Sequence, residues 1–304
     1  MSKLIAGAAV LILSWSAYAS EPKAYTDSEF ISELSKVNAI IDESKERYLS
    51  QYQIEDLLRD PSPQIRKAAV KNSKSYILNN SIYEKVIYIL KNRSELLDIR
   101  IEAARTLCYA TGYSEVRDAL KDIIRYEEKK ELKIMAYKAL WTATNYSEIK
   151  DFLLDAVRYN EREEELKQAA VWALFSVSPD YNVRNRLIEI ARNTNESEVL
   201  RIEAIKSLYS ASGYYEVKDK LIDIVKYSNE EKSIKLIAIK ALAGANNDSN
   251  VKSFLDDIIR WGNDEELKVA AIWASNPSIS EINELFHLPY RLHTGIIINP
   301  IEKE

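Results

Sequence analysis

Residues 65–69 read Ile65-Arg66-Lys67-Ala68-Ala69, and this arrangement recurs along the chain: an aliphatic residue, a basic residue and, four positions after the first, an alanine. Successive copies are separated by 33 or 34 residues. A fixed period of this length is the sequence signature of a repeat protein, in which each repeat packs only against its neighbours. Seven copies are visible: Ile65-Arg66, Ile99-Arg100, Leu132-Lys133, Leu166-Lys167, Leu200-Arg201, Ile234-Lys235 and Leu267-Lys268.

Each copy predicts one helix, and the segment before it predicts a second. Apolar or small residues stand at offsets 0, 4 and 8 of a copy, as at Ile99, Ala103 and Leu107, and these offsets share one face of an α-helix. The intervening segments, such as residues 116–124, carry apolar residues at offsets 0, 4, 7 and 8, a stripe that must be buried. Short turns such as residues 112–114 separate the two. The pattern therefore predicts antiparallel helix pairs stacked into a superhelix.

The segment Leu57-Leu58-Arg59-Asp60-Pro61-Ser62-Pro63-Gln64-Ile65-Arg66-Lys67-Ala68-Ala69 resembles a HEAT repeat, with its aspartate-proline turn followed by the aliphatic-basic-x-x-Ala motif. The resemblance covers roughly residues 50–287. The tetratricopeptide repeat is the structural rival because it also has 34 residues, but its Trp, Gly, Tyr and Pro markers do not recur. The resemblance implies an all-α fold, a right-handed α-solenoid of about seven HEAT-like helix pairs.

The ends of the chain differ from its middle and predict four segments. Residues 1–19 are expected to form a signal peptide, residues 20–49 an N-terminal capping helix, residues 50–287 the repeat solenoid, and residues 288–304 a C-terminal tail. Terminal repeats need a cap because their outer faces would otherwise be exposed. We expect the tail, which ends in an extended stretch, to fold back over the last helix.

The first residues predict export. Lys3 precedes an apolar run from Leu4 to Leu13, and small residues lead to a cleavage site after Ala19. The run has about half of the roughly 20 residues that a membrane-spanning helix needs, which disfavours an anchor that is retained. No Cys follows the cleavage site, which argues against a lipoprotein. We expect a periplasmic or secreted protein with no membrane anchor after cleavage.

Charge and cysteine content exclude several classes of function. The net charge is −5, and −6 once Lys3 is removed, so binding to nucleic acid, which needs positive charge facing phosphates, is not expected. Cys108 is the only cysteine, so no internal disulfide can form. Its apolar helical position predicts a buried, inert thiol, and the alternatives are an intermolecular disulfide or a reactive thiol.

The basic residues of the seven motifs form the most regular polar feature of the sequence. In HEAT-like proteins, the corresponding residues commonly pair with acids of neighbouring repeats, so the resemblance implies a structural ladder of ion pairs. The candidate partners are the acids nearest in sequence: Asp60, Asp98, Glu131, Glu165 and Glu198.

The position at offset 6 in each motif helix lies opposite the buried face and is predicted to be exposed. We call these residues the inner-face column, because the resemblance places the second helix of each pair on the concave surface. The exposed Trp and basic residues favour a site that binds an acidic or extended peptide. The alternative is a solvated face whose tryptophans cover gaps beside Trp141 and Phe175. The column comprises Lys71, Arg105, Lys138, Trp172, Lys206, Lys240 and Trp273, of which the last six are the candidate binding residues.

A cation and an aromatic residue close several of the first helices. The cations favour the negative end of the helix dipole. The aromatic rings are expected to pack on adjacent repeats, and a role in stacking on carbohydrate stays open. The pairs are Arg125-Tyr126, Arg158-Tyr159, Lys226-Tyr227 and Arg260-Trp261.

Few residues support an enzymatic function. His287 and His293 are the only histidines, and neither precedes Glu, so the His-Glu dipeptides of the HEAT-like deoxyhypusine hydroxylases are absent. No metal site, cofactor or glycine-rich phosphate loop is predicted. The sequence favours an exported scaffold that binds a protein or peptide. The alternative is a lyase-like or carbohydrate-processing enzyme that uses scattered carboxylates.

Overall fold

The computed structural model describes residues 49–227, 229–278, 281–282, 285–286, 290–291 and 297–298. The chain divides into two units, residues 1–53 and 54–304, and the second contains the repeats. The predicted signal peptide and all but the last residue of the predicted capping helix lie outside the described residues.

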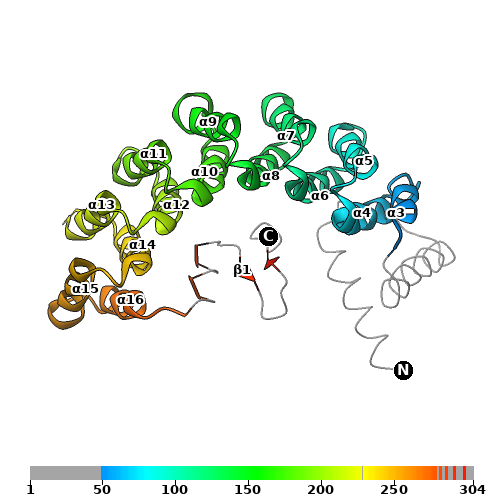
Figure 1. Ribbon diagram of the computed structural model, residues 1–304. Helices are drawn as coiled ribbons and strands as arrows, with labels where there is room; N and C mark the ends of the chain where they lie inside the picture. Colours follow the sequence, from blue (N-terminus) through cyan, green and yellow to red (C-terminus); the bar gives the residue numbers. More distant parts are fainter. Residues whose placement is uncertain are drawn as a thin grey trace, which may run out of the picture. The chain divides into compact units, whose positions relative to one another are not determined.

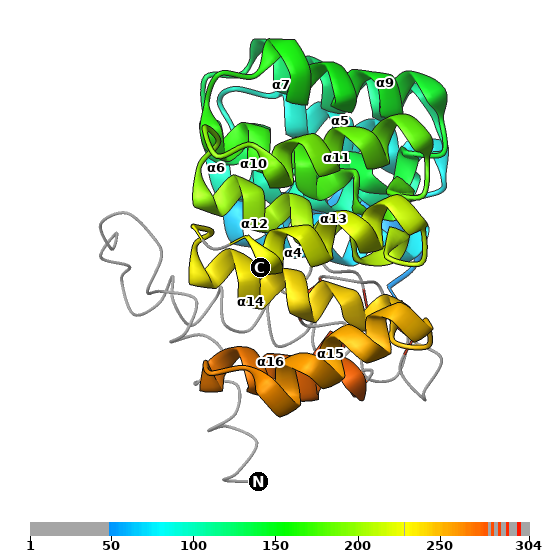
Figure 2. The ribbon, with the colours of Figure 1, turned by 90° about the vertical axis from the view of Figure 1, so that its left-hand side faces the viewer.

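Seven helix pairs follow one another in the described part of the chain. The first helices of the pairs are α3 (Gln51–Leu57), α5 (Asn80–Lys91), α7 (Ser114–Tyr126), α9 (Ser147–Asp155), α11 (Tyr181–Arg192), α13 (Tyr215–Lys226) and α15 (Ser249–Trp261). The second helices are α4 (Pro63–Asn72), α6 (Leu97–Leu107), α8 (Lys130–Ala139), α10 (Glu164–Ala173), α12 (Glu198–Ser207), α14 (Lys232–Ala241) and α16 (Glu265–Ser275). The repeats of the second unit form an arc (Figure 1). The even-numbered helices from α4 to α16 lie on its inner side, and the odd-numbered helices from α5 to α15 lie on its outer side. Figure 2 shows the pairs stacked one on the next.

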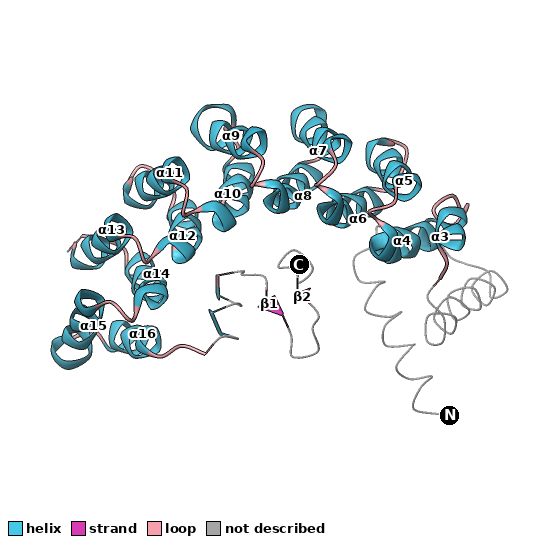
Figure 3. Cartoon of the chain, viewed as in Figure 1, coloured by secondary structure: helices cyan, strands magenta, loops and turns pink. Residues whose placement is uncertain are grey.

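Short irregular helices and one strand pair complete the described structure. Figure 3 separates these helices, strands and loops by colour. Strands β1 (Tyr290–Arg291) and β2 (Ile297–Ile298) pair antiparallel, with Tyr290 opposite Ile298. The 3-10 segments are η2 (Ser73–Tyr76), η3 (Cys108–Ala110), η4 (Leu140–Ala143), η6 (Phe175–Val177), η7 (Tyr209–Ala211) and η8 (Leu242–Ala245), and α9 continues into the π-helical η5 (Ala156–Asn160).

The core runs through the motif positions that the sequence predicted. Ile99, Ala103 and Leu107 of α6 are 0% exposed, and so are Val116 and Leu120 of α7. Burying one such aliphatic side chain contributes about 1.5–3 kcal/mol, so the repeated stripe stabilises every interface between neighbouring pairs. The prediction of an all-α solenoid with seven helix pairs is confirmed.

Several helices begin at a side-chain cap. Asp180 accepts hydrogen bonds from the backbone N–H groups of Asn182 and Val183, and Asp248 caps α15 in the same way. These carboxylates satisfy donors that have no partner within the helix and interact with the positive end of the helix dipole. Asp180 also pairs with Lys150 of the preceding repeat at 2.7 Å, so the cap fixes the stacking of the repeats as well.

The motif cations form an inner ladder of ion pairs between consecutive repeats, as the resemblance implied. Arg201 shows its geometry: the guanidinium pairs with Glu230 of the next repeat at 2.5 Å, and Nε donates to the carbonyl of Ala191 at 3.0 Å. One side chain therefore joins three segments. The described rungs are Arg66–Glu95, Arg100–Glu127, Lys167–Glu196 and Arg201–Glu230.

The partners of the ladder differ from the predicted acids. The carboxylates that pair with the motif cations come from the loop just before the next inner helix. Glu95 is an example, and the hydrogen bond from Arg66 lowers its pKa. Asp98 lies in the first turn of α6, where it pairs with Lys67 at 2.7 Å instead. Glu165 likewise pairs with Lys130, Glu198 accepts from Ser233, and Asp60 contributes its backbone carbonyl to Arg66.

Candidate binding site

The inner-face column places one side chain on each inner helix. Its members meet across repeats: the ammonium of Lys138 lies 5.5 Å from the ring centroid of Trp172, and that of Lys240 lies 5.7 Å from Trp273. A cation over an indole face is stabilised by about 0.5–1 kcal/mol at an exposed site. The repeat spacing therefore brings four of the predicted residues together as two cation–aromatic pairs, Lys138 with Trp172 and Lys240 with Trp273.

The predicted exposure of this column is wrong at one position. Trp172 is 4% exposed and belongs to the core. Its ring packs against Phe175 at 5.3 Å between centroids, and Trp141 packs against the same Phe175 ring at 5.4 Å. The alternative reading, in which the tryptophan covers a gap beside these rings, is confirmed at Trp172. Lys71 is exposed, and the remaining members are half-buried: Arg105, Lys138, Lys206, Lys240 and Trp273.

A second series of aromatic residues runs beside the column. We call Trp141, Phe175 and Tyr209 the aromatic row; each follows the leucine at offset 8 of its repeat. Sequence reasoning missed Tyr209 as part of this site, although its position in the repeat was visible. The next member of the row is Ala243, which carries no ring. The aromatic row therefore ends at Tyr209.

A residue from beyond the last helix adds a further ring at that end. Phe286 stacks on Tyr209 with 4.2 Å between ring centroids and an interplanar angle of 18°, and lies 6.5 Å from Trp273. Phe286 is only 2% exposed, so the concave side buries it completely. Phe286 thus packs on the last repeats, but it belongs to residues 50–287; the predicted return of the tail, residues 288–304, falls almost wholly outside the described residues.

Close packing between repeats holds Tyr209 in place. A β-carbon added at Gly244 would lie 2.2 Å from Ser212 Oγ and 2.8 Å from the carbonyl oxygen of Tyr209. These distances are far below ordinary contact, so η8 can approach η7 this closely only with glycine at position 244. Burial also raises the pKa of the Tyr209 phenol, which keeps it protonated.

The carboxylate of Glu281 lies near the same residues. Ser278 and Glu281 form a reciprocal capping box: the Glu281 N–H donates to Ser278 Oγ at 3.3 Å, and the Ser278 N–H donates to Glu281 Oε2 at 3.2 Å. The hydroxyl of Ser278 also donates to this carboxylate. The hydrogen bonds from Ser278 lower the pKa of Glu281, and the indole of Trp273 and the charge of Lys240 lower it further. Trp273, which lies 6.5 Å from Phe286 between ring centroids, thus also influences the charge of Glu281.

The N-terminal half of the concave side has a different character. A cavity of about 450 Å³ lies between α4 and α6, and its lining includes Lys71, Lys74, Glu102, Arg105 and Tyr109. Arg105 pairs with Glu102 at 2.7 Å, and the Lys74 ammonium lies 4.3 Å from the Tyr109 ring centroid. This lining suits an anionic group better than an apolar one.

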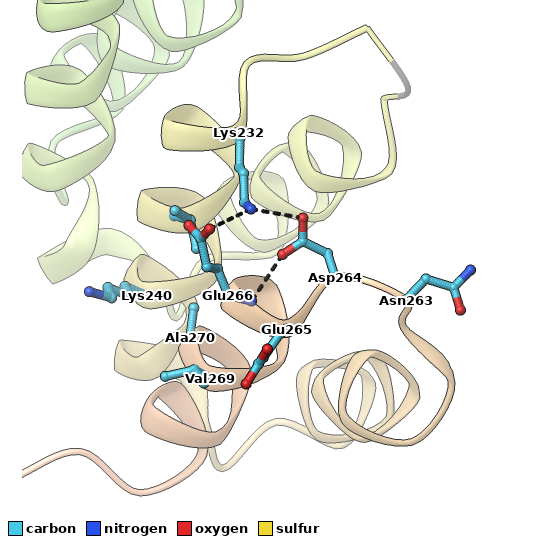
Figure 4. A pocket seen from close by; sticks show the side chains of 9 residues that line it. Lys232, Lys240, Asn263, Asp264, Glu265, Glu266, Val269 and Ala270 are labelled. Carbon is cyan, nitrogen blue, oxygen red and sulfur yellow. Dashed lines mark hydrogen bonds and ion pairs between the residues drawn. The ribbon is translucent and has the colours of Figure 1, made fainter.

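A further cavity of about 560 Å³ lies between α14 and α16 (Figure 4). Lys232 dominates it, with Asp264 at 3.0 Å and Glu266 at 2.7 Å. The hydrogen bonds of these two acids raise the pKa of Lys232, and Lys232 in turn lowers the pKa of Asp264. Asp264 also caps α16. These ion pairs connect α14 to α16 across the cavity. Because Lys232, Asp264 and Glu266 neutralise one another, none of them is poised as a catalytic acid or base.

The residues at the ends of the outer helices correct another expectation. Tyr126, Tyr159, Tyr227 and Trp261 are 53–77% exposed, so these rings do not pack on adjacent repeats. Two of the preceding cations do: Arg125 lies 5.3 Å from the Phe152 ring centroid, and Lys226 lies 5.5 Å from that of Phe254. A long side chain can lie along the neighbouring repeat and still reach water with its charged end, whereas the rigid aromatic ring points outward.

The described residues offer little for catalysis. No three His, Cys, Asp or Glu side chains among them gather as a metal site requires. Cys108 is buried, as expected. Tyr137 donates to Glu161 at 3.2 Å, and burial raises its pKa, so the phenol is not activated as a base. His287 and His293 lie outside the described residues. Within that same part of the chain, no helix has the length and apolar character to cross a membrane.

Comparisons with known proteins concern the repeat architecture. No family model and no curated protein matches the chain. Solved structures that match include Escherichia coli YibA, with 14% identity and a TM-score of 0.34 over 86% of this chain and 100% of that one. Human deoxyhypusine hydroxylase in complex with glycerol matches with 13% identity and a TM-score of 0.35, over 77% and 84% of the two chains.

A third match is the complex of CpcE and CpcF of phycocyanin lyase from a Nostoc species, with 13% identity and a TM-score of 0.38 over 75% of this chain and 94% of that one. All three are HEAT-like helical repeat proteins. Their low identities and TM-scores carry no argument about activity.

Proposed function

We propose that the protein is an exported interaction scaffold, periplasmic or secreted, whose concave side binds a protein or peptide. The observation that carries this proposal is the docking of Phe286, a residue from outside the helix pairs, on Tyr209 and Trp273. The inner helices can thus bury a side chain presented by a polypeptide segment outside the helix pairs. The signal-like first residues support export, and the scarcity of catalytic groups favours binding over catalysis.

The charges of the concave side define the partner further. Lys206 and Lys240 are half-buried, Lys240 lies over the Trp273 ring, and Lys71 lies exposed in the cavity of the first repeats. An extended segment that crosses several repeats would meet a column cation on each inner helix except α10 and α16, where Trp172 and Trp273 stand, and would meet rings near α12 to α16. This surface suits an acidic polypeptide with occasional aromatic residues, because aromatic residues bind as anchors and carboxylates pair with the cations.

A photocrosslinking experiment tests this function in the full-length protein expressed in its own host. A photoreactive amino acid replaces Lys206 on the inner side, and a matched control replaces Asp223, an exposed residue on outer helix α13. We expect crosslinks to a defined polypeptide from position 206 only, and their loss in a Lys240→Glu background. Equal labelling from both positions contradicts the proposal, and a crosslinked small molecule supports the enzymatic alternative.

A further inference from the structure

The first repeat departs from the aromatic row of the later repeats. Trp141 and Phe175 pack ring against ring across their repeat interface, with 5.4 Å between centroids. The first repeat carries Lys74 at the same position, directly after Ser73 at offset 8, and the second repeat carries Cys108 there. The first two inner helices therefore have no ring pair at this position, and the cavity of about 450 Å³ lies between them.

The lining of this cavity is positively charged, although the chain as a whole is acidic. Three cations and one carboxylate line it, so the lining carries a net charge of +2, whereas the chain carries −5. Arg105 pairs with Glu102 at 2.7 Å, so the excess positive charge of the lining comes from Lys71 and Lys74. A concave surface with one sign of charge attracts ligands of the opposite sign.

Lys71 is not needed to complete the end of its helix. It stands in the last turn of α4, where a cation also interacts with the negative end of the helix dipole. The carbonyl of Ala68 accepts a hydrogen bond from Asn72 Nδ2 at 2.8 Å. The carbonyl of Val70 accepts one from Ser73 Oγ at 2.7 Å. These carbonyls are satisfied without the ammonium group, which leaves Lys71 able to bind a ligand.

We propose that this cavity binds a small organic molecule through a phosphate monoester group, which Lys71, Lys74 and Arg105 recognise. A phosphate monoester carries about −1.5 to −2 charges at pH 7, which matches the net charge of the lining. A compact group of this kind can interact with several cations at once, since an ammonium acts on it as a point charge and a guanidinium presents a planar fork. A single carboxylate has about half of this charge.

The cavity has room for more than the phosphate. Its volume lies in the usual range of small-molecule sites, roughly 300–1,000 Å³. Ser75 and Tyr109 bring hydroxyl groups to the lining, and these can exchange hydrogen bonds with hydroxyl groups of a ligand. The class of molecule that fits this chemistry is a sugar phosphate. This inference goes beyond the proposed function, because the rings of α12 to α16 take no part in it.

Isothermal titration calorimetry of the full-length protein at low salt tests the site, with glucose 6-phosphate as the probe. We expect saturable binding to the wild type and a loss of about tenfold in affinity for each of Lys71→Met and Lys74→Met, because a hydrogen bond to a charged group contributes roughly this much. Lys67→Met is the matched control and should bind like the wild type. It removes the same charge from the same helix, but Lys67 pairs with Asp98 outside the lining.

Further probes identify the charged group and its source. Glucose should show no binding, and glucuronate, a sugar with one carboxylate, should bind about tenfold more weakly than glucose 6-phosphate. Vesicles of phosphatidylcholine with phosphatidic acid present a phosphate monoester on a membrane, and they should sediment no more protein than vesicles of phosphatidylcholine alone. Sedimentation with phosphatidic acid in the absence of glucose 6-phosphate binding would overturn the small-molecule source.

Two other outcomes overturn the inference. One is equal binding of glucose 6-phosphate to the wild type and to the Lys71→Met, Lys74→Met double variant. The other is tighter binding of an acetylated Glu-Glu dipeptide than of glucose 6-phosphate, which would assign the cavity to the acidic polypeptide of the proposed function. A polypeptide crosslinked from position 206 supports that function whether or not glucose 6-phosphate binds, so the two proposals fail separately.

Discussion

The two halves of the concave side are built on the same helix positions but present different chemistry. In α4 to α8, the inner-face column carries Lys71, Arg105 and Lys138, and the described cavity there is lined by charged groups. In α12 to α16, the rings of Tyr209 and Trp273 enclose Phe286. The difference teaches that core positions fix the repeat, whereas the outward positions vary between repeats and give each half its own surface chemistry.

Under the proposed function, the charged first half and the aromatic second half would contribute differently to binding one ligand. In the first half, Glu102 partly neutralises Arg105, and Lys74 lies over the Tyr109 ring. These contacts hold the positive groups in fixed positions. In the second half, burial of a ring provides most of the contact. A polypeptide that spans both would gain steering and specificity from the first half and most of its affinity from the second.

The largest effect is expected where the halves are alike, at the inner ladder. Arg201→Leu leaves Glu230 without its partner at a site where both side chains are about 5% exposed. Removing one partner of a buried ion pair typically costs about 3–5 kcal/mol, because a buried charge remains uncompensated. Urea unfolding should show this loss, and Arg100→Leu in the first half should lose as much, since Glu127 is equally buried.

The matched control for the ladder is Lys67→Met. Its pair with Asp98 is largely exposed, at 31% and 55% for the two side chains, and such pairs contribute under about 1 kcal/mol. If the losses in free energy of unfolding differ by more than twofold between Arg100→Leu and Arg201→Leu, the inner ladder does not stabilise the two halves equally.

A smaller effect should separate the halves. Gly244→Ala forces a methyl group against Ser212 and Tyr209, and overpacking of this kind costs about 1–3 kcal/mol. Gly112 and Gly213 have open space around them, so alanine there should change the free energy of unfolding by less than about 0.5 kcal/mol. Hydrogen exchange should locate the loss at α12 to α16. If Gly244→Ala is as neutral as Gly213→Ala, Tyr209 is not held as described.

The sequence predicted the frame much better than the site. Helix pairs and their buried faces follow from periodicity, because every repeat solves the same packing problem, as at Ile99 and Leu107. Trp172 was misplaced because a large ring at an outward position can turn back over its neighbour Phe175, which helical geometry alone does not reveal. The docking of Phe286 depends on a contact with Tyr209, 77 positions away, and Phe286 itself belongs to no repeat, so no period could indicate this contact.

The smallest effect concerns the charge of Glu281 in the C-terminal half. The pKa of Glu281 lies below its usual value of 4.5, mainly through Ser278 and further through Trp273 and Lys240, so the charged form is the one that the docked state prefers. The sign follows: the part of this effect that comes from Trp273 and Lys240 stabilises docking above about pH 4.5 and is lost as the pH falls through the lowered pKa. In protein labelled with 5-fluorotryptophan, the ¹⁹F resonance of Trp273, assigned with a Trp273→Phe variant, should shift with a midpoint below 4.5. Glu281→Gln should abolish that titration step and leave the resonances of Trp141 and Trp172 unchanged. A step that persists in Glu281→Gln would assign the titration to another carboxylate and would show that Glu281 does not interact with Trp273.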